Sequence, residues 1–327
     1  MNTPSKDKEL FNDVIGQEFA KVFLNAVLQK NKISTAYIFS GPDGVGKKLT
    51  ALRFLEGVIN KGNSSPRDRH RLELFQHPDL LWIEPTYQSQ GQLITQSKAS
   101  EIGLNTRTPP QIRLEQIREI SRFLSKIPLE ANYGMVVLEA VDKMAESAAN
   151  ALLKTLEEPK IGLLILITSR AEKLLPTIHS RCQIITFSSL NQIDFQKVVE
   201  IIAQNKKDNF TISDLSSHQE ISIMSNGSPG AFLENIQRWS SIPSSLWPYL
   251  QNLPKEPLSA LSLAKEISES LDLEQQLWLI NWLQQNIWVK QVNTQSIKRL
   301  EILRSQLCSF VQPRLAWEIA LLEMKEF

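Results

Sequence analysis

A loop that could hold phosphate is the clearest chemical feature of this sequence. The stretch "GPDGVGKKLT", Gly41 to Thr50, contains Gly-x-x-x-x-Gly-Lys, the pattern of a loop whose backbone N–H groups cradle phosphate. A strand-like run, "AYIFS", precedes it and a helical run, "KKLTALRFLEGVIN", follows it, so those N–H groups would converge at a helix N-terminus. The residues expected to form the nucleotide site at this loop are Gly41, Gly44, Gly46 and Lys47.

The residue after the loop lysine departs from the pattern. A magnesium-bound nucleotide needs a Ser or Thr hydroxyl there, whereas Lys48 brings a positive charge toward the metal. Thr50 is no substitute, because two residues along a helix turn a side chain by about 200° around the axis. The sequence therefore predicts a nucleotide-shaped loop without productive magnesium chemistry.

A second nucleotide-site element is expected in "GMVVLEAVDKM", Gly134 to Met144. A buried strand of this kind ends in one acid that holds the metal and another that polarises the attacking water. Glu139 occupies the first position and Ala140 the second, and a methyl group cannot act as a base. Because Lys48 and Glu139 both replace the usual residues, we expect their side chains to pair across the metal position.

The elements that must position these residues follow an α/β pattern. From about residue 11 to 190, short apolar runs alternate with amphipathic stretches, which predicts helices flanking a largely parallel, five-stranded sheet. The expected strands are 36–40, 79–84, 135–140, 163–169 and 183–187. The run Met144–Glu158 places its apolar residues on one helix face, and Pro159 ends it. The polar segment Tyr87–Pro110 is expected to be a long surface loop.

Beyond Leu190 the strand pattern stops. A short helical unit runs to about Arg238 and contains the turn Asn226–Gly230, and only helical patterns follow from Ser241. The stretch 271–290 is apolar around most of its circumference, which suits a core helix and equally a helix that offers a face to sister subunits. The predicted domains are 1–190, 191–240 and 241–327.

Composition limits the possible partners and the compartment. The chain has 36 Lys and Arg against 35 Asp and Glu, so any DNA contact must be local or shared with partners. Two distant cysteines, Cys182 and Cys308, indicate a reducing compartment without a disulfide framework. The N-terminal segment lacks an apolar targeting core, and no apolar stretch is long enough for a bilayer. We expect a cytoplasmic protein with no membrane partner.

Five motifs in register resemble a known family. They are "DVIGQE" at 13–18, "SGPDGVGK" at 40–47, "ANALLKTLEEP" at 149–159, "LLPTIHSRCQ" at 174–183 and "GSPGAFL" at 227–233. Together they resemble the clamp-loader branch of the AAA+ proteins, as found in the bacterial DNA polymerase III holoenzyme. The resemblance covers residues 11 to about 240, and the C-terminal third matches only in being helical and of suitable length. It implies an AAA+ P-loop module, a small helical lid and an all-helical collar that joins subunits in a hetero-pentameric ring.

The resemblance also assigns site residues. Ser180 and Arg181 match the start of the family's Ser-Arg-Cys motif, whose arginine reaches the ATP of a neighbouring subunit, so Arg181 would be a trans arginine finger. Without the flanking motif, an arginine here would be read as an ordinary surface residue. Thr168, or Ser169 beside it, falls where the family senses the terminal phosphate. Cys182 is expected to be a small buried apolar residue rather than a nucleophile.

Three departures bear on catalysis by this chain. Lys48 and Ala140 are joined by Gly230, which stands where active members have a second-sensor arginine. Together they match the family's non-hydrolysing role, in which a subunit lends its arginine to a neighbour and helps to load the sliding clamp on primed DNA. Such a chain belongs to a DNA-directed DNA polymerase holoenzyme but neither polymerises nor hydrolyses ATP. It requires no cofactor and would bind ATP or ADP only passively.

Two alternative functions belong to the enzyme class. The first is an active AAA+ ATPase that serves as a motor subunit of the same loader, against which the three departures argue. The second is a P-loop nucleotide kinase, which would have no use for "LLKTLEEP" or "SRC".

Two further segments bear on contacts with nucleic acid and with metal ions. In "QIRLEQIREISRFLSKI", Arg118 and Arg122 lie on one helix face and could bind DNA phosphates, although a solvated helix with internal ion pairs to Glu115 and Glu119 fits the same pattern. Many bacterial relatives carry a four-cysteine zinc module after the phosphate loop, but residues 57–80 hold no cysteine. The two histidines of that segment, His70 and His77, are expected at the surface, so no metal and no zinc is predicted.

Overall fold

The computed structural model describes residues 10–89, 92–102, 109–157, 162–205, 219–254, 256–291, 293–309 and 311–324. By its residue contacts the chain divides into two units, Met1–Lys197 and Val198–Phe327, each of which is described by itself. This division falls inside helix α8 (Gln192–Asn205). The finer division into three domains at 190 and 240 stays a prediction.

The first unit is built on a five-stranded parallel sheet. Its strands, in the spatial order β2-β5-β6-β1-β7, are β2 (Leu80–Ile83), β5 (Gly134–Leu138), β6 (Gly162–Thr168), β1 (Ala36–Ser40) and β7 (Gln183–Thr186). β5 and β6 are buried along their whole length, as expected for strands covered on both faces. All five predicted strands and the α/β fold class are confirmed.

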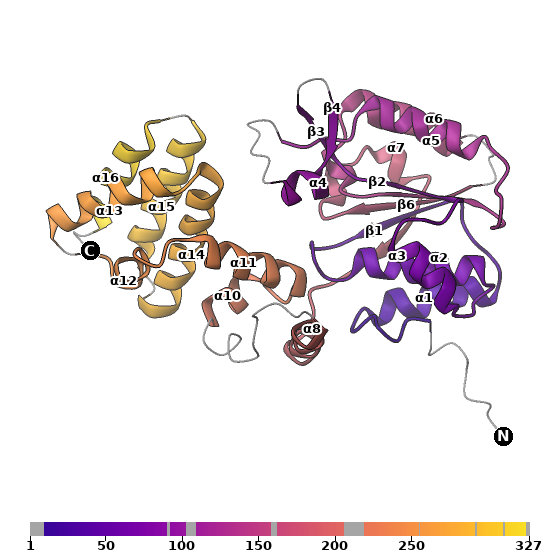
Figure 1. The fold of residues 1–327 in the computed structure, drawn as a ribbon, viewed down its shortest axis with the longest axis horizontal. Helices are drawn as coiled ribbons and strands as arrows, with labels where there is room; N and C mark the ends of the chain where they lie inside the picture. The colour runs from indigo at the N-terminus through magenta and orange to yellow at the C-terminus, as the bar shows by residue number, and fades with distance from the viewer. Residues whose placement is uncertain are drawn as a thin grey trace. The chain divides into compact units, whose positions relative to one another are not determined.

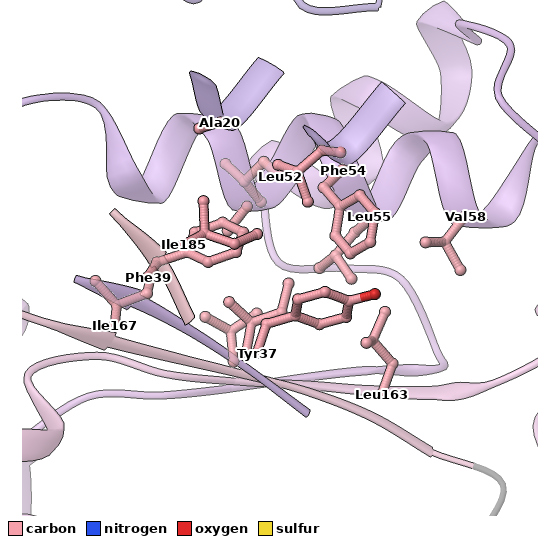
Figure 2. Close-up of a cluster of buried hydrophobic side chains, with 14 of the residues drawn as sticks. Ala20, Tyr37, Phe39, Leu52, Phe54, Leu55, Val58, Leu163, Ile167 and Ile185 are labelled. Atoms are coloured by element: carbon pink, nitrogen blue, oxygen red, sulfur yellow. The ribbon is translucent and has the colours of Figure 1, made fainter. Parts of the chain in front are cut away.

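Helices cover both faces of this sheet (Figure 1). One face carries α1 (Glu18–Gln29), α2 (Lys47–Ile59) and α3 (Pro66–Glu73), and the other carries α5 (Leu114–Leu124), α6 (Glu146–Glu157) and the single turn α7 (Pro176–His179). Figure 2 shows α2 lying over β1, where Phe54 meets the ring of Tyr37 edge-on with centroids 5.3 Å apart. These layers bring the carboxyl ends of the strands to one edge of the sheet, where ligands of such folds bind.

The segment expected to be a surface loop contains regular structure, so that prediction was wrong. β3 (Thr86–Ser89) and β4 (Gln92–Thr95) form an antiparallel hairpin with Tyr87 opposite Ile94, and α4 (Gln96–Glu101) follows with Ala99 buried. A two-stranded hairpin is held by backbone hydrogen bonds, which leave little apolar pattern in a polar sequence. Residues 103–108 of the predicted loop lie outside the described residues.

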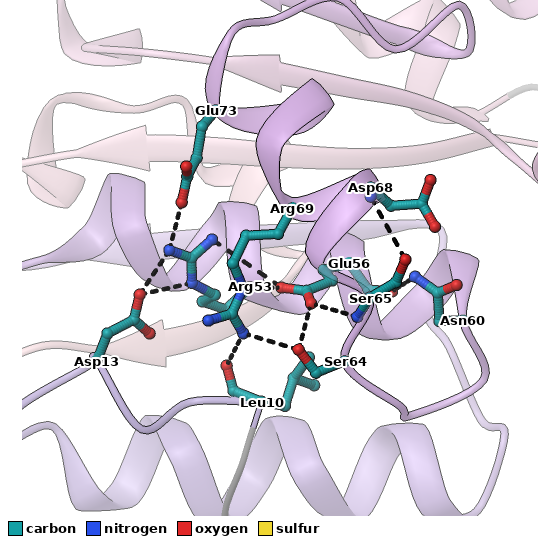
Figure 3. A network of polar contacts seen from close by, with 10 residues as sticks. All are labelled: Leu10, Asp13, Arg53, Glu56, Asn60, Ser64, Ser65, Asp68, Arg69 and Glu73. Atoms are coloured by element: carbon teal, nitrogen blue, oxygen red, sulfur yellow. Dashed lines mark hydrogen bonds and ion pairs between the residues drawn. The ribbon is translucent and has the colours of Figure 1, made fainter.

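A buried polar network locks α2 to its surroundings (Figure 3). Arg53, 4% exposed, donates to Asp13 before α1 and to Glu73 at the end of α3. Glu56, fully buried, accepts hydrogen bonds from the Ser65 N–H at 2.8 Å and from Arg69 Nε at 2.9 Å. The helix that follows the phosphate loop is therefore fixed by charged side chains as well as by the apolar core.

The second unit is helical throughout its described residues. Its helices after α8 are α10 (Gln219–Met224), α11 (Pro229–Ser241), α12 (Trp247–Gln251), α13 (Pro257–Ser270), α14 (Leu273–Gln291), α15 (Thr294–Cys308) and α16 (Pro313–Met324). Trp239 stacks on Trp247 and meets Trp278 and Trp282 edge-on, so these tryptophans build a core. None of the helices traced in either unit has both the length and the apolarity to cross a bilayer.

A candidate nucleotide site and a candidate arginine finger

The phosphate loop has the predicted position between β1 and α2. Gly44 and Gly46 adopt left-handed backbone angles, with φ of 75° and 101°, and Gly46 caps the N-terminus of α2. A Cβ on Gly41 would lie 2.2 Å from the carbonyl oxygen of Phe187, so only glycine lets the loop pass the exit of β7. The sequence thus folds locally as a loop that presents backbone N–H groups at a helix N-terminus.

Lys47 is held inside this loop. Its side chain is 4% exposed, and its ammonium group donates to the carbonyl oxygens of Gly41 and Pro42 and lies 3.5 Å from Asp43 Oδ1. Burial lowers the pKa of Lys47, and the neighbouring Asp43 opposes that shift. The three N–H donors of the ammonium group therefore have partners within the loop itself.

The predicted ion pair between Lys48 and Glu139 is confirmed, with Lys48 Nζ 2.7 Å from Glu139 Oε1. The same ammonium group lies 5.0 Å from the ring centroids of both Phe75 and Trp82, and the Trp82 indole N–H donates to Glu139 Oε1. We call these four residues the Lys48 cluster. Two aromatic faces and one carboxylate stabilise a cation at the end of β5.

The side chains at this position do not fit a magnesium ion. Mg²⁺ requires oxygen donors in near-octahedral geometry, whereas Glu139 Oε1 already accepts from two donors and Lys48 supplies a competing cation. Thr50, fully buried, donates its hydroxyl to the Gly46 carbonyl oxygen at 2.9 Å and is not available as a ligand. The methyl side chain of Ala140, the residue after Glu139, cannot act as a general base.

Thr168 lies at the end of β6 beside the loop, since the Gly41 N–H donates to its carbonyl oxygen at 3.2 Å. Its buried hydroxyl donates to Asp142 Oδ1 at 2.8 Å and accepts from the Arg170 N–H at 3.0 Å. Sequence reasoning missed Asp142, although an acid three residues after Glu139 at a strand exit could have signalled it. The partners of Thr168 are groups of its own chain.

Arg181 follows α7. None of the contacts found for its side chain among the described residues is with the phosphate loop or the Lys48 cluster. Its guanidinium group donates to Glu157 Oε1 at 2.7 Å, to the Thr177 carbonyl oxygen at 3.0 Å and to Ser180 Oγ at 3.2 Å. The side chain is 36% exposed. Thus the structure brings Ser180 and Arg181 together at a surface formed by α6 and α7.

Cys182 behaves as an apolar residue. Its side chain is partly buried against the cluster beneath α6, and burial raises the pKa of the thiol to about 12. A thiol with that pKa stays protonated at neutral pH and is a poor nucleophile, which agrees with the sequence-based expectation.

The two predicted DNA-binding residues are exposed on α5. Arg118 and Arg122 lie on the face opposite the buried side chains of that helix, and no ion pair found among the described residues joins either of them to Glu115 or Glu119. Gly230, which the family resemblance aligns with the second-sensor position, is the second residue of α11 in the other unit.

The histidine prediction was half wrong. His70 is exposed as expected, but His77 is buried, with its Nδ1 accepting from the Asp79 N–H at 3.2 Å. His77 lies in the turn before β2, which contacts between distant segments hold in place: the Asp79 carboxylate accepts N–H bonds of 2.7 Å from Leu129, Glu130 and Ala131. Within the described ranges, no group of three or more His, Cys, Asp or Glu residues could hold a metal ion.

Both units match models of known protein families. A family model described as "DNA polymerase III, delta subunit" matches residues 16–191, just over half of the chain. A second, "Cyanobacterial DNA polymerase III delta prime, C-terminal domain", matches residues 196–324 and so extends the resemblance to the C-terminal third.

Individual relatives agree with these models. DNA polymerase III subunit delta' of Bacillus subtilis is 33% identical over 176 residues, 52% of this chain and 46% of that protein. Subunit tau of the same organism is 35% identical over 182 residues, 55% of this chain and 29% of that protein. The chain thus matches less than half the length of either relative. A DNA polymerase III gamma subunit-related protein from Thermotoga maritima shares the fold, with a TM-score of 0.57 at 18% identity over 93% of this chain and 98% of that one.

The sheet order, the phosphate loop and the helical second unit define the class by its fold, an α/β P-loop module followed by a helical unit. The chain belongs to the DNA polymerase III delta-subunit family, in the delta-prime branch of its clamp-loader subunits.

Proposed function

We propose that this chain is a non-hydrolysing subunit of a DNA polymerase III clamp loader and supplies Arg181 to the ATP of a neighbouring subunit. In that role it occupies one place in a hetero-pentameric ring that loads a sliding clamp on primed DNA. The observation that carries the proposal is the 2.7 Å ion pair between Lys48 and Glu139. It places an ammonium group against the acid that an active ATPase would use to hold its metal.

The loop supports passive nucleotide binding at most. Phosphoryl transfer needs a metal ion to neutralise the developing charge and a group that orients the attacking water. The Lys48 cluster competes with the metal ion, and Ala140 lacks a group that could orient the attacking water. Any ATP or ADP that binds here would displace the Lys47 ammonium group from the loop carbonyls and would then stay unhydrolysed.

Arg181 supports the second half of the proposal. An arginine finger must be fixed, charged and accessible from outside its own subunit. Arg181 is anchored through α7, whose Ile178 is fully buried, and its guanidinium group remains partly exposed.

Reconstitution tests the proposal directly. The chain is co-purified with the other loader subunits of its own organism, and ATP turnover is measured for the chain alone and for the ring with and without it. We expect no turnover by the chain alone, stable incorporation into the ring, and ATPase activity that depends on its presence. Turnover by the isolated chain that Lys47→Ala abolishes would instead establish an active motor subunit.

DNA contact by Arg118 and Arg122 is a further part of the proposal. Exposed arginines that contact phosphates release counterions on binding, so reversing both charges should weaken DNA binding by the assembled ring and flatten its salt dependence. An unchanged salt slope would remove α5 from the DNA surface.

A further inference from the structure

The Arg181 side chain is partly committed within its own chain. Of the five guanidinium N–H donors, three are engaged by described residues: two on Nη1, with Thr177 and Ser180, and one on Nη2, with Glu157. The remaining Nη2 hydrogen and the Nε hydrogen have no partner among the described residues. The guanidinium group is thus held in one orientation while two donors stay available.

Among the described residues, Glu157 is the one charged partner of Arg181. It is the last residue of α6, and its carboxylate is 54% exposed, so the apolar core does not require it. A negative charge at the C-terminal end of a helix is unfavourable, because the last carbonyl groups carry partial negative charge there. The position therefore costs helix stability, which the contact with Arg181 offsets.

Glu157 and Arg181 belong to or follow helices whose other side chains are buried in the core. α6 buries Ala148 and Leu152, and α7 buries Ile178, in one apolar cluster. The ion pair thus joins two supports that the core already holds in place. A long arginine side chain has several rotatable bonds, and fixing it before a ligand arrives removes part of the entropy cost of binding.

We propose that Glu157 is the positioning residue for Arg181: it holds the guanidinium group in the orientation that a phosphate of the neighbouring subunit meets. The inference rests on the proposed function and deepens it, since it names the residue that prepares the finger. Glu157 touches no reacting group and acts only through Arg181. Its effect should therefore appear in the step that Arg181 accelerates and not in the affinity for ATP.

The test uses the assembled loader with full-length chain. Glu157→Ala should lower kcat at the served site by about fivefold, the size expected of an exposed ion pair, with KM for ATP unchanged. Glu157→Gln should keep most of the rate, because the amide oxygen still accepts from Nη2. In a chain that also carries Arg181→Ala, Glu157→Ala should cause no additional loss. Glu146→Ala, an exposed acid at the other end of α6, is the matched control and should leave the rate unchanged.

Each other outcome has a distinct meaning. An unchanged rate in Glu157→Ala, a higher rate, or an equal loss in the Arg181→Ala background would overturn the positioning role. If Arg181→Ala alone leaves the rate of the loader unchanged, the proposed function fails and Glu157 has no finger to position. Incorporation of each variant into the ring, measured by size-exclusion chromatography, separates these cases from a failure to assemble.

Discussion

The phosphate loop and the α6–α7 surface treat their positive charges in opposite ways. At the loop, Lys47 is buried and bonded to loop carbonyls, and Lys48 is paired with Glu139 between two aromatic rings. At the α6–α7 surface, Arg181 is fixed by three contacts but remains partly exposed, and two of its N–H donors have no partner among the residues that the structure describes. The difference supports the proposal that the chain neutralises the charges at its own phosphate loop and keeps one cation available for a partner.

The largest stability effect should come from the buried network behind the phosphate loop. Glu56→Ala removes a fully buried carboxylate and leaves Arg69 and the Ser65 N–H without their acceptor. Breaking a buried pair in this way costs about 3–5 kcal/mol of unfolding free energy, which urea denaturation measures.

A variant at the α6–α7 surface is the control for the denaturation of Glu56→Ala. Arg181→Ala removes a partly exposed side chain and should change the unfolding free energy by less than about 0.5 kcal/mol. Equal losses for the two variants would mean that the loop region is no more rigidly built than the α6–α7 surface, and the comparison would fail.

A smaller effect is expected in the Lys48 cluster. Lys48→Ala removes an ion pair and two ring contacts, but the side chain is half exposed and solvent screens the pair, so the cost should be about 1 kcal/mol or less. Loss of the ammonium group beside Trp82 should also alter the tryptophan fluorescence. Lys154→Ala, an exposed lysine of α6, is the control, and identical stability and spectra for the two variants would argue against the cluster.

The smallest effect concerns pH. Burial lowers the pKa of His77 in the folded chain below its usual value of 6.5. At a pH between the folded-state pKa and 6.5, the unfolded chain therefore binds more protons than the folded chain. Stability from this residue is therefore present above about pH 6.5 and is lost as the pH falls toward the folded pKa. His77→Gln should flatten the acid limb of a stability–pH curve, whereas His70→Gln at an exposed position should not. Identical slopes in both variants would contradict the burial of His77.

Local sequence patterns predicted the parts of the molecule that short-range physics controls. The strands are continuous apolar runs, and the loop follows from glycines that need left-handed angles, so both were found correctly. The pairing of Lys48 with Glu139 was predicted because two substitutions in known motifs leave complementary charges at neighbouring positions.

Contacts between distant segments were not predictable in the same way. The turn that contains His77 is tied to Leu129, fifty residues later, through the Asp79 carboxylate, and Glu157 and Arg181 meet because α6 and α7 pack on one cluster. The β3–β4 hairpin was not predicted, because backbone hydrogen bonds hold it and such bonds leave no apolar pattern in a polar sequence. In each case the missing information is the tertiary arrangement rather than the identity of the residues.

One measurement tests the central contrast most directly: ATP turnover by the assembled loader carrying either Lys47→Ala or Arg181→Ala in this chain. The account predicts that Lys47→Ala leaves the rate nearly unchanged, because no hydrolysis occurs at its loop. Arg181→Ala should lower turnover at the one site it serves by on the order of a thousandfold, as expected for loss of an arginine finger. A large loss with Lys47→Ala together with a wild-type rate for Arg181→Ala would contradict the account.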